Sequence, residues 1–115
     1  MKPVNFLLLL LSFAIGIVGC SKCDNENPRS RIVNNGTDKA SVQIKTSGGN
    51  TENINNIQPG QSSEWRSFAE GTIEFTVAIQ GQADQVLNVA MATCWEYAIT
   101  IDSNNVVSSI PTERN

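Results

Sequence analysis

From residue 31 onward, apolar and polar residues alternate along the chain, and this period of two limits what the chain can fold into. The clearest run spans residues 72–79, where the larger apolar side chains stand at every second position from Ile73 to Ile79. Successive side chains of a β-strand point to opposite faces, so this pattern is typical of a strand with one buried face. Long helical periodicity is nearly absent, and we therefore expect an all-β domain.

Turn-forming segments interrupt the alternation at intervals of about 8–12 residues, which is the spacing typical of a β-sandwich. Asn34-Asn35-Gly36 and Ile57-Gln58-Pro59-Gly60 are two of them, in which glycine accepts a left-handed backbone and proline fixes φ. We expect one small β-sandwich of seven to eight short antiparallel strands. Its predicted inward-facing residues are Val42, Ile44, Ile73, Phe75, Val77, Ile79, Leu87, Val89, Trp95, Tyr97, Ile99 and Ile101.

The segment 62–68 is ambiguous. Trp65, Phe68 and Ala69 fall at helical spacing, and Ser62 could cap a short helix. We expect a strand or an irregular edge instead, because the segments on both sides are predicted to be strands.

The N-terminus carries an apolar run, Phe6 to Val18, that follows one early cation, Lys2. A helix needs about 20 apolar residues to cross a hydrocarbon core, and this run is shorter. Its length suits the apolar region of a cleaved signal peptide, which is about 7–15 residues. An uncleaved membrane anchor and an ordinary secretory signal are the alternatives.

The run ends in Ile17-Val18-Gly19-Cys20, which resembles the lipobox of bacterial lipoproteins. The resemblance implies that residues 1–19 are a signal peptide cleaved between Gly19 and Cys20, and that the Cys20 thiol carries lipid. The mature protein would then be anchored in a bacterial cell envelope, at the outer membrane, without spanning the bilayer.

Residues 20–30 follow the predicted signal peptide and are mostly polar, so we expect a lipidated cysteine followed by a flexible tether. Ser21, Lys22, Asp24 and Glu26 resemble the acidic export signal of surface-displayed lipoproteins from Bacteroidota-type bacteria. This resemblance implies a surface-exposed protein, and a plain solvated linker is the alternative. The sandwich is expected over residues 31–110, with a polar tail at 111–115.

Composition excludes several kinds of chemistry. The chain contains no histidine, which removes the usual general base and the commonest metal ligand. Its formal net charge is −3 without a basic cluster, so we expect no nucleic-acid partner. No carboxylate lies in a recognised catalytic motif. The segment Asp102-Ser103-Asn104-Asn105 lacks the glycine and the distal glutamate of a calcium-binding loop. We expect no catalytic residue, no metal and no cofactor.

Two cysteines remain if Cys20 is lipidated. An exported compartment permits a disulfide between Cys23 and Cys94, which would close a loop of about 70 residues. Cys23 lies three residues from the predicted anchor, where a flexible chain would be useful, and this argues against the bond. Cys94 would also suit a small buried apolar site. The sequence leaves both interpretations open, a Cys23–Cys94 disulfide and an unbonded, buried Cys94.

Aromatic residues supply the remaining candidate site. Trp65 and Phe68 could form an exposed platform for a ligand, whereas Trp95 and Tyr97 share the parity of core positions. The motif from Ile57-Gln58-Pro59-Gly60 to Gly71 resembles small immunoglobulin-like or transthyretin-like sandwich modules of exported bacterial proteins. We expect a non-catalytic module that contacts another envelope protein, and a glycan-binding accessory module is the alternative.

Overall fold

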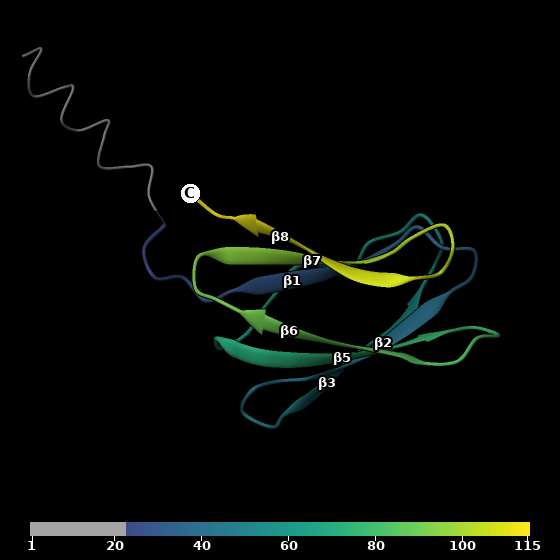
Figure 1. The fold of residues 1–115 in the computed structure, drawn as a ribbon, viewed down its shortest axis with the longest axis horizontal. Helices are drawn as coiled ribbons and strands as arrows, with labels where there is room; N and C mark the ends of the chain where they lie inside the picture. Colours follow the sequence, from purple (N-terminus) through teal and green to yellow (C-terminus); the bar gives the residue numbers. More distant parts are fainter. Residues whose placement is uncertain (1–22) are drawn as a thin grey trace, which may run out of the picture.

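The computed structural model describes residues 23–115, which form two four-stranded β-sheets packed face to face (Figure 1). The strands are β1 (Arg29–Asn34), β2 (Ala40–Lys45), β3 (Thr51–Ile57), β4 (Arg66–Ser67), β5 (Gly71–Ile79), β6 (Gln85–Met91), β7 (Trp95–Ile101) and β8 (Val107–Glu113). The described residues contain no helix that could span a membrane. The predicted signal peptide and lipidated Cys20 lie outside the described residues. The expected all-β sandwich is confirmed.

One sheet has the strand order β4-β1-β7-β8 and the other β3-β2-β5-β6, and Figure 1 shows them as two layers. Five of the six strand pairings are antiparallel, as expected. The pairing of β1 with β7 is parallel, with Ile32 opposite Ile99, so the expectation of antiparallel strands throughout is wrong for this pair. Parallel neighbours need a long connection, and the strands between β1 and β7 supply it. Local alternation carries no information about strand direction.

The core lies between the two sheets and takes side chains from both. Its buried apolar residues are Ile32, Ala40, Val42, Ile44, Ile57, Phe68, Ile73, Phe75, Val77, Ile79, Val89, Met91, Tyr97, Ile99 and Ile101. The predicted core is confirmed except at Leu87 and Trp95, which are only partly buried. Leu87 lies on the edge strand β6, Trp95 is the first residue of β7, and both pack against the core.

The ordered domain extends past both predicted boundaries. β1 begins at Arg29 rather than at residue 31, and β8 continues through Pro111 and Thr112 to Glu113. The expected polar tail at 111–115 is therefore mostly strand, with Thr112 paired to Glu96. β8 is an edge strand, and proline is tolerated there because the N–H it lacks can face away from the ladder.

The segment 62–68 forms an irregular edge, as expected. Ser62 makes an isolated bridge to Val33, and only Arg66 and Ser67 form a strand, β4. The Ser63 hydroxyl accepts a hydrogen bond from the backbone N–H of Ile32 at 2.9 Å. Side-chain and backbone contacts thus hold this segment against β1, because the regular β1–β4 pairing covers only two residue pairs.

A buried polar network fixes the loops at the end of the sandwich where β1 stops. Asn34 is fully buried, and its amide donates to the carbonyls of Asp38 and Ile57, both at 2.9 Å. Its side-chain oxygen accepts from the N–H of Gly36 at 2.9 Å. A Cβ at Gly36 would overlap the side-chain oxygen of Asn105, so this close approach requires glycine.

Candidate functional site

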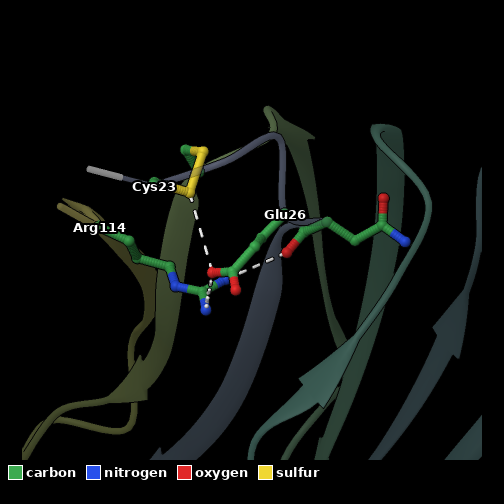
Figure 2. Close-up of a disulfide and its surroundings, with 5 residues drawn as sticks. Cys23, Glu26 and Arg114 are labelled. Atoms are coloured by element: carbon green, nitrogen blue, oxygen red, sulfur yellow. Dashed lines mark hydrogen bonds and ion pairs between the residues drawn. A yellow bond between two sulfur atoms is a disulfide. The ribbon is translucent and has the colours of Figure 1, made fainter. Parts of the chain in front are cut away.

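The opposite end of the sandwich, which we call the disulfide end, is closed by a bond between Cys23 and Cys94. The two Cα atoms are 5.8 Å apart, and the two cysteines are 71 positions apart in the sequence (Figure 2). Cys94 lies in the turn between β6 and β7 and adopts a left-handed backbone conformation, with φ of +65°. The structure therefore contains the disulfide that the sequence left open, and the bond joins the residues before β1 to the turn between β6 and β7.

Hydrogen bonds reinforce this link along the segment 23–28. The backbone N–H of Cys94 donates to the carbonyl of Glu26 at 2.9 Å, and the N–H of Phe68 donates to the carbonyl of Pro28 at 2.9 Å. Pro28 itself is among the fully buried side chains. The segment is thus bound to the turn between β6 and β7 and to the residue that follows β4, before β1 begins.

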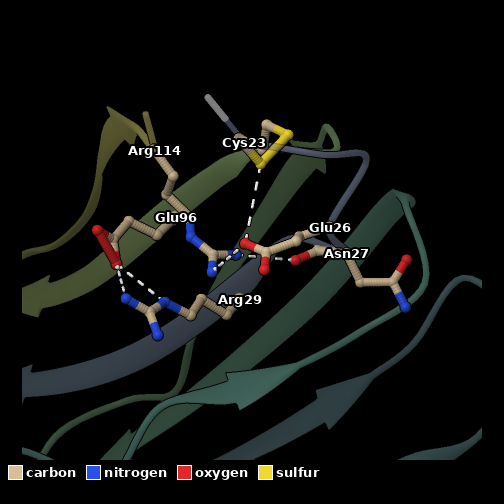
Figure 3. Close-up of polar contacts among 7 residues, drawn as sticks. Cys23, Glu26, Asn27, Arg29, Glu96 and Arg114 are labelled. Carbon is tan, nitrogen blue, oxygen red and sulfur yellow. Dashed lines mark hydrogen bonds and ion pairs between the residues drawn. A yellow bond between two sulfur atoms is a disulfide. The ribbon is translucent and has the colours of Figure 1, made fainter. Parts of the chain in front are cut away.

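Arg114 closes the disulfide end from the C-terminal side. Its guanidinium forms an ion pair with Glu26 at 2.8 Å and donates to the carbonyl of Asn27 at 3.2 Å (Figure 3). Its backbone N–H donates to the carbonyl of Cys94 at 2.8 Å. A sulfur of the disulfide lies 3.8 Å from the Glu26 carboxylate, but it carries no proton to donate, so this contact adds no hydrogen bond.

The expected flexible tether covered residues 20–30, and these contacts correct that expectation for residues 23–30. Residues 23–28 are bound to the domain by a disulfide and by backbone hydrogen bonds, and Arg29 already belongs to β1. The composition of this segment is polar, but its backbone groups find partners on the sandwich. Lys22 and the residues before it lie outside the described part of the chain.

The outer face of the β4-β1-β7-β8 sheet carries the second candidate feature, which we call the arginine–tryptophan face: Arg29, Arg31 and Trp65. Alternate residues of β1 are buried, so Arg29 and Arg31 stand on the outer side of the sheet. Their guanidinium carbons lie 4.7 and 4.8 Å from the centre of the Trp65 ring. Both distances fall within the range of cation–π attraction.

Glu96 of β7 neutralises one of the two cations. Its carboxylate lies 3.0 Å from a terminal nitrogen of Arg29 and also accepts a hydrogen bond from Arg29 Nε at 3.1 Å (Figure 3). The side chain of Glu96 is only 20% exposed. The register of β1 against β7 places Glu96 opposite Arg29.

The predicted aromatic platform does not form. Phe68 is 5% exposed and belongs to the core, whereas Trp65 is half-buried on the outer face beneath the two arginines. Tyr97 is buried, as expected, and its hydroxyl accepts from the N–H of Ala92 at 2.9 Å. The helical spacing of Trp65 and Phe68 could not show this separation, because the backbone between them is extended and irregular.

The described residues show no metal site. No group of three or more cysteine, aspartate and glutamate side chains in residues 23–115 is placed to hold a metal ion. Asp102 instead stabilises its own turn, because its carboxylate accepts from the N–H groups of Asn104 and Val106 at 2.8 and 2.9 Å. This arrangement is an Asx turn, which is a structural use of the residue.

No family model and no curated protein sequence matches the chain. Two solved structures are similar in fold. The C-terminal domain of AlgF from P. aeruginosa has a TM-score of 0.50 at 14% identity, covering 79% of this chain and 100% of that domain. A protein from Eubacterium rectale has a TM-score of 0.53 at 15% identity, covering 81% of this chain and 95% of that one. At such low identity, the similarity supports the fold alone.

Proposed function

We propose that this chain is a lipid-anchored, non-catalytic interaction module of the bacterial cell envelope, and that it contacts another envelope protein. The observation that carries the proposal is the position of Cys23. It follows the predicted lipidated residue, Cys20, by three positions and is covalently bound to the sandwich through Cys94. The expected anchor and the folded domain are therefore almost adjacent in the chain.

Chain geometry sets how close the domain would be to the lipid. An extended chain spans at most about 3.3–3.6 Å per residue, so three residues reach roughly 11 Å. The disulfide end would then face the bilayer, and the loops around Asn34 and Asn105 would face away from it. A module held in this way presents the side faces of its sheets to neighbouring proteins of the same membrane.

The residue types support a binding role over a catalytic one. A chain without histidine lacks the usual general base and the partner that activates a serine or cysteine nucleophile. Two of the arginines, Arg29 and Arg114, are each engaged in an ion pair with a glutamate. The alternative of a glycan platform loses its basis, because Phe68 is buried and Trp65 is covered by guanidinium groups.

Replacing Cys20 by alanine tests the anchor. In cells that process lipoproteins, we expect wild-type protein to pellet with membranes, resist carbonate extraction and show the added mass of lipid. We expect Cys20→Ala to move to the soluble fraction. The matched control is Cys23→Ala, which removes a neighbouring thiol and should stay lipidated. If Cys20→Ala still resists extraction, the lipid anchor is wrong.

We further propose that the anchored domain faces outward from the outer membrane, on the basis of the resemblance of residues 21–26 to a surface-export signal. Lys39 and Lys45 are exposed on the sandwich and can report this. A membrane-impermeant amine reagent applied to intact cells should label them as efficiently as in lysed cells. Labelling that appears only after lysis would place the domain on the periplasmic face.

A further inference from the structure

Arg31 is not neutralised by any carboxylate of the described chain, unlike the other arginines there. Arg29, Arg66 and Arg114 form ion pairs with N···O distances of 3.0, 3.1 and 2.8 Å. Within residues 23–115, Arg31 takes part in none of these pairs, and its Nε is buried without a hydrogen-bond acceptor. A guanidinium has five donors and stays charged at physiological pH, so Arg31 keeps an unused capacity to bind an anion.

Trp65 holds this cation in place. The Arg31 guanidinium carbon lies 4.8 Å from the centre of the Trp65 ring. Stacking on an aromatic ring restricts a side chain that would otherwise sample many rotamers. Binding of an anion to this side chain therefore costs less conformational entropy. Arg29 lies over the same ring but is paired with Glu96. Arg31 is therefore the preorganised, unneutralised cation of the arginine–tryptophan face.

An apolar strip adjoins Arg31 on the outer face of the sheet. The register places Ala98 of β7 opposite Arg31, and Ile110 of β8 opposite Ala98. Ala98 is small and half-buried, whereas Ile110 is 53% exposed. Neighbouring strands are about 4.8 Å apart, so the row leads from a cation, over a small side chain, to an exposed aliphatic side chain within roughly 10 Å.

We infer that the row Arg31–Ala98–Ile110 is the docking surface for a partner protein that presents an aspartate or glutamate carboxylate beside an aliphatic side chain. The inference rests on the proposed function, since the envelope partner proposed there is the protein that carries this carboxylate. Charge complementarity identifies its chemistry: the chain has a net charge of −3, yet this row offers an unneutralised guanidinium. Arginine and tryptophan are also the residue types enriched where binding energy concentrates in protein interfaces.

A carboxylate suits this site because it can accept two parallel hydrogen bonds from a guanidinium fork. An aliphatic neighbour of the carboxylate would cover Ala98 and bury part of Ile110. A neutral sugar suits it less, because sugar rings stack on a free aromatic face and two guanidinium groups lie over Trp65. An acidic glycan also offers a carboxylate, so the experiment includes one as a separate arm.

The test is a titration of the full chain in detergent micelles, with or without lipid on Cys20, and with 15N-labelled arginine observed by NMR. The Nε–H of Arg31 is buried, which slows its exchange with water and makes its signal observable. The probe is the acetylated, amidated tripeptide Leu-Glu-Leu, and its Leu-Gln-Leu counterpart differs only by the missing charge. An oligoglucuronate forms the third arm. The Nε–H signals of Arg66 and Arg114 serve as internal references.

We expect Leu-Glu-Leu to shift the Arg31 signal saturably and Leu-Gln-Leu to leave it in place. Arg31→Gln should weaken peptide affinity by about ten- to a hundredfold, as expected for loss of a charge-assisted hydrogen bond. Arg31→Lys keeps the charge without the planar fork and should retain part of the affinity. Lys45→Gln is the matched control, because it removes an exposed cation from the other sheet, and it should bind like the wild type.

An Arg31 signal that stays unchanged in the wild-type protein at high concentrations of Leu-Glu-Leu would overturn the inference. This result needs no variant. Equal shifts with Leu-Gln-Leu would overturn the role of the carboxylate. Tighter binding of oligoglucuronate than of the peptide would overturn the protein partner in favour of an acidic glycan. The titration does not depend on where the chain is anchored, so failure of the Cys20→Ala fractionation would leave its result interpretable.

Discussion

Replacing Cys23 and Cys94 together by alanine removes the covalent closure of the disulfide end and leaves the two sheets intact. The bond spans 71 residues of sequence. In the chain-entropy model, a cross-link over a loop of this length restricts the unfolded chain enough to stabilise the native state by about 4 kcal/mol at 25 °C. Small domains are stable by roughly 5–15 kcal/mol in total, so the bond would supply a large share.

Urea unfolding of residues 20–115 with Cys20 replaced by serine, followed by tryptophan fluorescence, measures this effect. For a domain of this size the urea dependence is about 1 kcal/mol/M, so the midpoint should fall by roughly 4 M in the double variant. Reduction of the parent protein should reproduce the same midpoint. A loss below about 1 kcal/mol would refute the reasoning, because it would mean that the bond constrains the unfolded chain very little.

A second variant separates the covalent link from the contacts around it. Arg114→Gln removes the ion pair with Glu26, in which the side chains of Arg114 and Glu26 are 19% and 58% exposed, and the exposed hydrogen bond to the Asn27 carbonyl. Exposed ion pairs contribute about 0–1 kcal/mol, so this variant should unfold within that margin of the parent protein. A loss as large as that of the double cysteine variant would assign the stability of the disulfide end to the ion pair instead.

Two further stability predictions concern buried side chains. Asn34→Ala should lower the free energy of unfolding by about 2–4 kcal/mol, because it leaves buried backbone groups without hydrogen bonds, whereas exposed Asn35→Ala should stay within about 0.5 kcal/mol. Equal thermal midpoints for these two variants would contradict the buried network. Phe75→Ala should cost about 3–5 kcal/mol through a cavity between the sheets, and Val86→Ala, which truncates an exposed side chain of the neighbouring strand, should cost far less. Denaturant unfolding measures both, and similar losses would contradict the assigned core.

The strands that face the core were predictable because their signal is local. Ile73, Phe75 and Val77 alternate with polar residues on a single strand, and burial of one face is enough to produce that pattern. The ends of the domain were less predictable. Arg29 and Thr112 are polar residues on strands, and a sequence without pairing information does not separate such residues from a tether or a tail.

The candidate surface was predictable only in part. Trp65 stood out as an aromatic residue between polar neighbours, and its half-buried position agrees with that. Its partners Arg29 and Arg31 lie more than 30 residues away, and their alternation at the start of β1 was the one local signal that could have placed them on an outer face. Nothing in the sequence paired Glu96 with Arg29, since that contact depends on β1 and β7 being parallel neighbours.

The sequence by itself determined the β-sandwich class, the position of most turns and the expectation of an anchor at Cys20, because each of these depends on short-range patterns of polarity and backbone freedom. The tertiary structure decided that Cys23 is bonded to Cys94, that β1 runs parallel to β7, and that Arg31 stays unneutralised beside Trp65 while Arg29 does not. These features join residues that are distant in the chain. They follow from strand order and register, and many strand orders satisfy the same alternation of apolar and polar residues.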